Sequence, residues 1–148
     1  MPNAIQFLSV AQVQQLHMTS LDYHGGIAGL RDARLLDAAV SMARATFGGA
    51  LLHPTPAAIA AAYLYHIAMA HAFVDGNKRT ACFAAMVFLD ANGIAHDITP
   101  EELELATIEV ASGQLSKYAL IELFIHWLSR STRRRPPRLT WQWQGAPD

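Results

Sequence analysis

Residues 71–80 read HAFVDGNKRT and separate two apolar segments, 55–70 and 80–92, that both have the character of helices. Gly76 can adopt a positive φ, and the aspartate and asparagine on either side of it are residues whose side chains bond to nearby backbone. A turn is therefore expected between the two segments. The sequence predicts a pair of apolar helices joined by this short polar link, and that pair decides the fold.

The composition indicates one folded domain. The chain has 148 residues, of which 52% are apolar and 16% charged, with a formal net charge of −1. These values exclude a disordered chain and give no general argument for binding nucleic acid or an anionic membrane. Cys82 is the only cysteine, so a disulfide framework is excluded and a reducing cytoplasm is expected. The chain begins without the basic start and apolar run of a signal peptide.

Six helices with short connections are expected, and no segment alternates as a paired strand does over a useful length. Ser, Thr or Asp stands where most of them begin, and Gly where most of them end. This pattern predicts an all-α bundle in residues 1–131, followed by a basic tail with proline and tryptophan in residues 132–148. The expected helices lie within 9–18, 32–47, 55–70, 80–92, 99–112 and 116–128.

The polar link carries a set of residues suited to phosphate chemistry. Its helix start would direct unpaired N–H groups outward, and Lys78 and Arg79 add two positive charges, which together predict an anion site. His71 precedes the turn and has the side chain best matched to accept a proton near neutral pH. Asp75 can bind Mg²⁺ together with phosphate oxygens and water.

Each residue also has a purely structural interpretation. A lone histidine such as His71 can be a core residue, Asp75 can be a helix N-cap, and Asn77 can be a turn residue. Lys78 and Arg79 can be a solvated first turn. These structural interpretations would all have to be true at once to explain the cluster. Moreover, the helix dipole disfavours adjacent cations at a helix N-terminus. The functional interpretation is therefore favoured, most clearly for the two cations.

The segment 71–79 resembles the signature of the Fic/Doc family, and in particular its death-on-curing (Doc) branch, His-x-Phe-x-Asp/Asn-Gly/Ala-Asn-Lys-Arg. Every fixed position of that signature is met. Two further stretches look like the flanking signatures of the family. They are GGIAGLRDARLL at 25–36 and TPEE with ASG within 99–113.

This resemblance implies an all-α Fic fold that transfers part of a nucleoside triphosphate to a protein hydroxyl. It implies that His71 is the catalytic base, that Asp75 binds Mg²⁺ and that Phe73 packs under the loop. It also implies that the nucleotide phosphates are held by Gly76, Asn77, Lys78 and Arg79.

Three positions depart from the pattern of the AMP-transferring members, which have Pro, Gly and Arg where this chain has Ala72, Lys78 and Cys82. In the Doc branch this change accompanies transfer of the terminal phosphate of ATP. The resemblance therefore favours a toxin that is a protein kinase acting on a Ser/Thr hydroxyl of translation elongation factor Tu, restrained by a separate antitoxin. AMP transfer, or an inactive module that binds nucleotide or a partner, is the alternative. Residues 44–52 fall where the family has a target-docking flap, and the residues alone predict only a loop.

Overall fold

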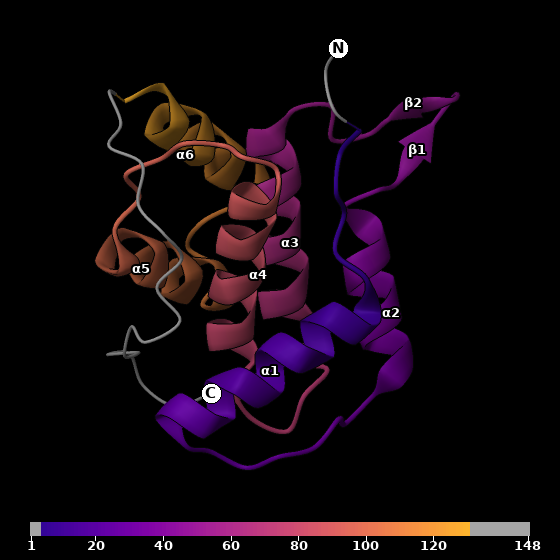
Figure 1. The fold of residues 1–148 in the computed structure, drawn as a ribbon, viewed down its shortest axis with the longest axis vertical. Helices are drawn as coiled ribbons and strands as arrows, with labels where there is room; N and C mark the ends of the chain where they lie inside the picture. The colour runs from indigo at the N-terminus through magenta and orange to yellow at the C-terminus, as the bar shows by residue number, and fades with distance from the viewer. Residues whose placement is uncertain (1–3, 131–148) are drawn as a thin grey trace.

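The computed structural model describes residues 4–130, which are almost entirely helical (Figure 1). This part of the chain contains six helices and one two-stranded antiparallel sheet, so the predicted all-α fold is confirmed. The predicted tail, 132–148, lies outside the described residues. The elements are α1 (Val10–His24), α2 (Ala33–Met42), β1 (Thr46–Phe47), β2 (Ala50–Leu51), α3 (Pro56–Ala70), α4 (Asn77–Ala91), α5 (Pro100–Ala111) and α6 (Lys117–Ser129).

The predicted N-caps are present in the structure. At the start of α5, Thr99 Oγ1 accepts from the N–H of Glu102 at 3.1 Å, and the Glu102 carboxylate accepts from the N–H of Thr99 at 3.0 Å. This reciprocal pair is the predicted capping box. The side chains that accept from backbone N–H groups in this way are Ser9, Asp32, Thr55, Thr99 and Ser116.

The first helix is longer than predicted. It was expected to end near Met18, but α1 continues to His24. The helix stops only at Gly25, which has φ 73° and donates its N–H to the carbonyl of Leu21 at 2.8 Å. The reason is that no glycine or proline interrupts the chain before that point.

The second helix is shorter than predicted. It ends at Met42 rather than at Gly48 and Gly49, because these glycines have φ 60° and 82° and form a two-residue turn between β1 and β2. Two positive φ values are the requirement of a type I′ hairpin turn. Phe47, the last residue of the helix predicted over 32–47, instead lies beside this turn and is 82% exposed.

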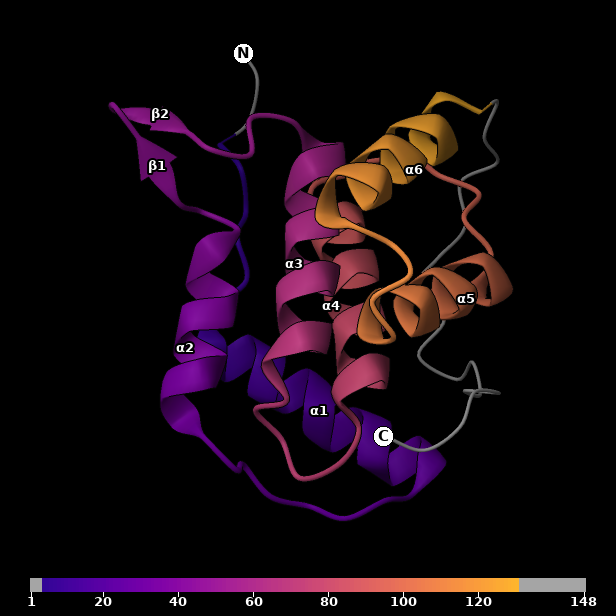
Figure 2. The same cartoon turned by 180° about the vertical axis from the view of Figure 1, so that it is seen from behind.

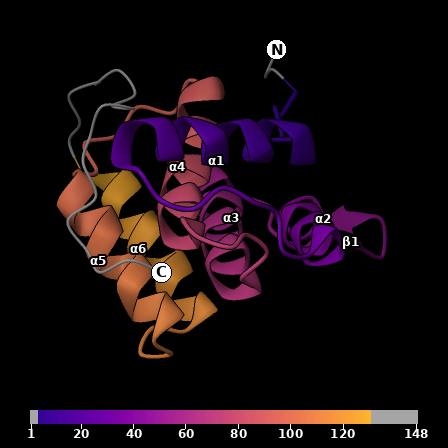
Figure 3. The ribbon, with the colours of Figure 1, turned by 90° about the horizontal axis from the view of Figure 1, so that it is seen from below.

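The helices α3 and α4 lie side by side at the centre, and the others surround them (Figures 1 and 2). α3 contacts α2, α4, α5 and α6, which explains why its small residues are buried on every side. Seen from below, α1 runs across this pair (Figure 3). Within residues 4–130, no helix has both the length and the apolar character needed to span a bilayer.

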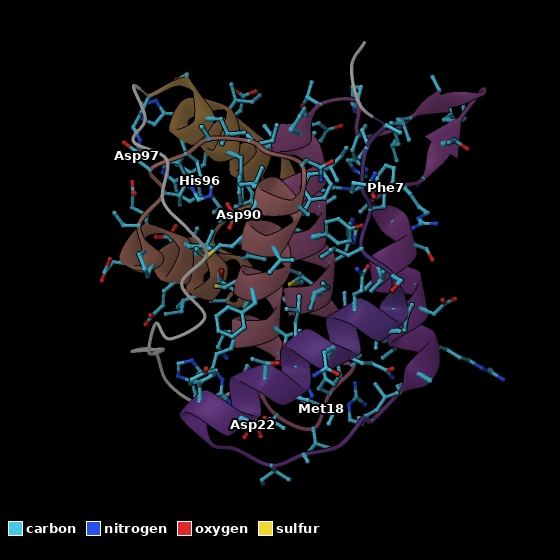
Figure 4. The ribbon with its side chains drawn as sticks, viewed as in Figure 1. Phe7, Met18, Asp22, Asp90, His96 and Asp97 are labelled. Atoms are coloured by element: carbon cyan, nitrogen blue, oxygen red, sulfur yellow. The ribbon has the colours of Figure 1, made fainter. Side chains whose placement is uncertain are left out.

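At the end of the α3–α4 pair away from their link, side-chain contacts hold neighbouring segments against α4 (Figure 4). His96, in the segment between α4 and α5, has Nε2 3.4 Å from Asp90 Oδ1, and Figure 4 labels both residues. Phe7 packs against Phe88 of α4, and the guanidinium of Arg44 lies 5.4 Å from the centre of the Phe7 ring. These contacts stabilise the scaffold and leave the link between α3 and α4 at the opposite end.

Candidate functional site

The link between α3 and α4 is shaped by two residues in the left-handed region. His71 is the C-cap of α3, with φ 50° and ψ 42°, and Gly76 is the N-cap of α4, with φ 80°. Among residues 4–130, His71 is the only non-glycine residue with a positive φ. Strained backbone of this kind persists where the surroundings enforce it, and it concentrates at functional sites. The His71 side chain is exposed, so the imidazole is accessible to an incoming group.

The loop is braced from within by Asn77 and Phe73. The Asn77 side chain is 3% exposed, with Oδ1 accepting from the Phe73 N–H and Nδ2 donating to the Phe73 carbonyl, both at 3.0 Å. Phe73 is itself 3% exposed and packs in the core under the loop, as the resemblance implied. Because both polar groups of the Asn77 side chain are used here, its contribution to an anion site would come from its backbone N–H.

Asp75 is held by two backbone groups. Its Oδ1 accepts from the N–H of Gly76 at 2.9 Å, and its Oδ2 accepts from the N–H of Ile27 at 3.0 Å. A Cβ atom added at Gly26 would lie 2.7 Å from Asp75 Oδ2 and 2.9 Å from Arg79 Nη2. The carboxylate and the guanidinium therefore both lie close to the bare backbone of Gly26. Asp75 joins two segments through its hydrogen bonds and is not a simple helix cap.

The connection between α1 and α2 runs along the link and fixes its backbone (Figure 2). The N–H of Val74 donates to the carbonyl of Gly29 at 3.0 Å, and the N–H of Arg31 donates to the carbonyl of Ala72 at 2.7 Å. The Arg31 guanidinium donates from Nε to the carbonyl of His71 at 2.8 Å. In the structure, Arg31 therefore holds the backbone of His71.

His17 of α1 was not identified from the sequence. It is 4% exposed, its Nε2 donates to the carbonyl of Asp75 at 2.7 Å, and its ring stacks on Phe73 with centroids 3.8 Å apart and planes 10° apart. The sequence signal that could have identified His17 is its position on one face of α1 with Val13 and Ser20, both of which are buried. A histidine on such a buried face needs a polar partner in the core.

A model of the Fic/DOC family matches residues 7–89, more than half of the chain. The chain belongs to the Fic/DOC family. It is also similar to a curated protein named Toxin Doc from Mycolicibacterium smegmatis, with 46% identity over 90 residues that cover 60% of this chain and 69% of that protein. The protein named Protein kinase doc from Escherichia phage P1 is 30% identical over 112 residues, which cover 76% of this chain and 87% of that protein.

Positive charge dominates around the Fic/DOC motif. No side chain caps the N-terminus of α4, and Lys78 and Arg79 occupy its first turn, where the helix dipole disfavours cations. Burial, followed by the positive charge of Arg79, lowers the pKa of the nearby His24. The lowered pKa favours the neutral form of His24, and the Asp75 carboxylate lies beside this turn. Such a field favours a bound anion.

The donors present are compatible with a Mg²⁺ ion that is shared with phosphate. Within residues 4–130, no group of three or more His, Cys, Asp or Glu side chains is arranged to hold a metal ion. Asp75 uses one bond on each oxygen, and each carboxylate oxygen can accept two, so a coordination position remains. Mg²⁺ commonly binds through one or two carboxylates with substrate phosphates and water completing the shell.

Cys82 occupies the position of the second arginine of AMP-transferring members, and it is buried in the core. Its Sγ lies 3.0 Å from Thr107 Oγ1 of α5, and it was predicted to be a small buried residue. The six predicted site residues lie in the link between α3 and α4 and in the first turn of α4, and their chemical roles remain predictions. The six are His71, Asp75, Gly76, Asn77, Lys78 and Arg79.

Proposed function

We propose that this chain is a Doc-type toxin kinase, which transfers the γ-phosphate of ATP to a Ser/Thr hydroxyl of elongation factor Tu in the cytoplasm. The observation that carries the proposal is the link between α3 and α4. There an exposed imidazole, a carboxylate and an uncapped helix N-terminus with two cations lie within nine residues. The names of the two relatives, a toxin and a protein kinase, support the same activity.

In this mechanism the acceptor hydroxyl loses its proton to the imidazole of His71 as its oxygen attacks the γ-phosphorus. The bond between that phosphorus and the β–γ bridging oxygen breaks, and ADP leaves. Lys78, Arg79 and the N-terminus of α4 offset the charge on the phosphate oxygens. Asp75 would hold Mg²⁺, which supplies further neutralisation of the triphosphate when bound. Arg31 keeps the backbone of His71 in its strained conformation, so the base is positioned before substrate arrives.

Transfer of AMP is the second candidate. The family's AMP-transferring members have glycine at the position of Lys78, which leaves bare backbone against the phosphates. The lysine side chain and the absence of an arginine at Cys82 support transfer of the terminal phosphate instead. The two reactions differ in which phosphorus is attacked.

Labelled ATP separates these two activities. The purified chain is incubated with elongation factor Tu and ATP carrying label in either the γ- or the α-phosphate. Label from the γ-position alone supports the kinase, whereas label from the α-position overturns it in favour of nucleotide transfer. Label from neither, with this acceptor and with whole translation extract, supports a binding module without activity.

Two variants test the base. His71→Ala removes the imidazole, and His71→Asn does so with a residue that tolerates the left-handed region. We expect both to lower γ-phosphate transfer by about 10²–10⁴-fold, the usual contribution of a general base. Growth arrest on expression should disappear with them, and should also be relieved by an antitoxin encoded in a neighbouring reading frame. Arrest that survives both substitutions would remove the catalytic interpretation.

A further inference from the structure

A cavity of about 190 Å³ lies between the segment that follows β2 and the first turns of α6. Its lining residues are Leu52, His53, Lys117, Tyr118 and Ile121. It is distant from the motif, because β2 leads into the start of α3 whereas the motif follows the end of that helix (Figure 1). None of its lining residues takes part in the site described above.

Among residues 4–130, no carboxylate forms an ion pair with His53 or Lys117. His53 is 4% exposed, and its Nδ1 is buried without a hydrogen-bond partner in the described part of the chain. The half-buried Lys117 is the first residue of α6, where the dipole disfavours a cation. Burial lowers the pKa of Lys117. Burial and the Lys117 charge lower the pKa of His53, against a hydrogen bond to the backbone of Met42 that raises it. No carboxylate is among the causes of either shift.

A second histidine, His66 of α3, is affected by the charges of the same two side chains. Burial, then the charges of Lys117 and His53, lowers the pKa of His66 to about 4, and its Nε2 is buried without a partner among the described residues. Three basic side chains, from the segment before α3, from α3 and from α6, thus act on one another through space. The lowered pKa values favour the neutral forms of both rings, so Lys117 carries the positive charge of this group, and a half-buried cation without a counter-ion is unfavourable.

We infer that this cavity is a binding site for a small organic carboxylate. The charged end would be received by Lys117, the N-terminus of α6 and the buried ring of His53. Leu52, Tyr118 and Ile121 provide apolar walls, which a bare inorganic anion would leave unused. Since a water occupies about 30 Å³ of liquid, the volume corresponds to roughly six waters, the size of a short aliphatic or aromatic acid.

The test is an NMR titration of the full chain with histidine ring nitrogens labelled. Hexanoate and benzoate are the probes, and hexanamide and benzamide are their neutral counterparts. Substitution of His53 and His66 one at a time assigns their signals. Titrations are repeated on Lys117→Met and Lys117→Gln, two variants that lose the charge with different side chains. Lys78→Met is the matched control, since it removes a first-turn cation from the motif helix instead.

We expect saturable shifts of the His53 and His66 signals with both acids and none with the amides. Binding should weaken by about tenfold or more in both Lys117 variants, the usual effect of losing a charged hydrogen bond, and should be unchanged in Lys78→Met. Equal binding by the Lys117 variants, or no shift with either acid, would overturn the proposal. So would inorganic phosphate binding as tightly as the organic acids, because the apolar walls would then have no role.

Discussion

Three carbonyl oxygens at the motif turn are each bonded by a residue far away in the chain. Arg31 donates to the carbonyls of His71 and Ala72, and His17 donates to that of Asp75. The carbonyls of His71 and Ala72 follow the last turn of α3 and have no partner inside a helix, and that of Asp75 lies in the loop before α4. Leaving a buried carbonyl unpaired is costly. These contacts therefore do two things: they stabilise the turn, and they fix the positions from which His71 and Asp75 project.

Replacing His17 by phenylalanine tests the role of its hydrogen bond to the Asp75 carbonyl. The aromatic ring can still stack on Phe73, but the donor to the Asp75 carbonyl is lost. We expect a decrease in the free energy of unfolding of about 1–3 kcal/mol, because a buried acceptor loses its partner. We also expect a lower kcat for γ-phosphate transfer with an unchanged KM for ATP. Urea denaturation and steady-state kinetics measure the two effects.

Met18→Phe is the control for His17→Phe, because Met18 is the next residue of α1 and is 58% exposed. It should change the free energy of unfolding by less than about 0.5 kcal/mol. If His17→Phe keeps the parent's kcat, the histidine stabilises the fold without positioning the turn.

Gly26→Ala tests the close approach of Asp75 and Arg79. The new Cβ would lie 2.7 Å from Asp75 Oδ2, so the carboxylate has to move. Gly25→Ala is the matched control, since Gly25 also has a positive φ but nothing lies within 4 Å of an added Cβ. Both variants should lose about 1–2 kcal/mol of stability from backbone strain. Only Gly26→Ala should also lose γ-phosphate transfer, and equal activity in the two variants would contradict the assigned geometry.

At the scale of elements, α5 and α6 are tied by a residue just beyond the last helix. Arg130 donates to Asp97 Oδ1 at 2.9 Å and to Glu102 Oε2 at 2.7 Å. Glu102 also completes the capping box of α5 with Thr99. One arginine therefore links the end of α6, the start of α5 and the segment before it.

The Arg130 contact should make stability depend on pH. Its hydrogen bond is the main cause that lowers the pKa of Glu102 from 4.5 to about 2. A carboxyl whose pKa is lower in the folded state stabilises the fold above pH 4.5 and loses this contribution as the pH falls toward 2. We expect Arg130→Gln to lower the free energy of unfolding by about 1–2 kcal/mol at pH 7, allowing for screening at these partly exposed groups.

The difference between the parent and Arg130→Gln should shrink below pH 4.5 and vanish near pH 2, as followed by denaturant unfolding across this range. Arg34→Gln, at an exposed position of α2, should show no such pH-dependent difference. A difference that stays constant between pH 7 and pH 2 would exclude Glu102 as its source.

At the scale of the whole molecule, the site depends on how closely α3 can be enclosed. Four helices contact it, and the alanines of its first half are buried on all sides. Because alanine side chains are a single methyl group, the neighbouring helices can pack closely against α3. This packing fixes the C-terminal end of α3, where His71 is the cap. The hairpin of β1 and β2 lies at the far end of α3 from the motif, as Figures 1 and 2 show.

Ala61→Leu tests this enclosure. Ala61 has no exposed surface, so three added carbons force neighbouring helices apart. We expect a loss of about 1–3 kcal/mol in the free energy of unfolding, measured by urea denaturation. Ala38→Leu adds the same atoms at an exposed position of α2 and should change stability by less than about 0.5 kcal/mol. A comparable loss of stability in both variants would mean that the lower helix propensity of leucine, and not packing around α3, causes the loss.

Much of this protein could be predicted from the sequence alone because the responsible interactions are local. A cap such as Thr99 acts on a backbone group three residues away, and the apolar run of α3 defines a buried helix by itself. The motif was visible for the same reason, since its residues are neighbours in the chain. Where local signals misled, as at Gly48 and Gly49, a glycine pair that can end a helix can also turn a hairpin.

Only the tertiary structure decided which distant residues serve that motif. His17 lies 58 residues from Asp75, and Arg31 lies 40 residues from His71. No spacing rule joins such pairs, because their meeting depends on how α1 crosses the central helices. The cavity beside α6 likewise exists only after His53 and Lys117, far apart in the chain, are brought together. The sequence determined the helices and the chemistry of their link, and packing determined what holds that chemistry in place.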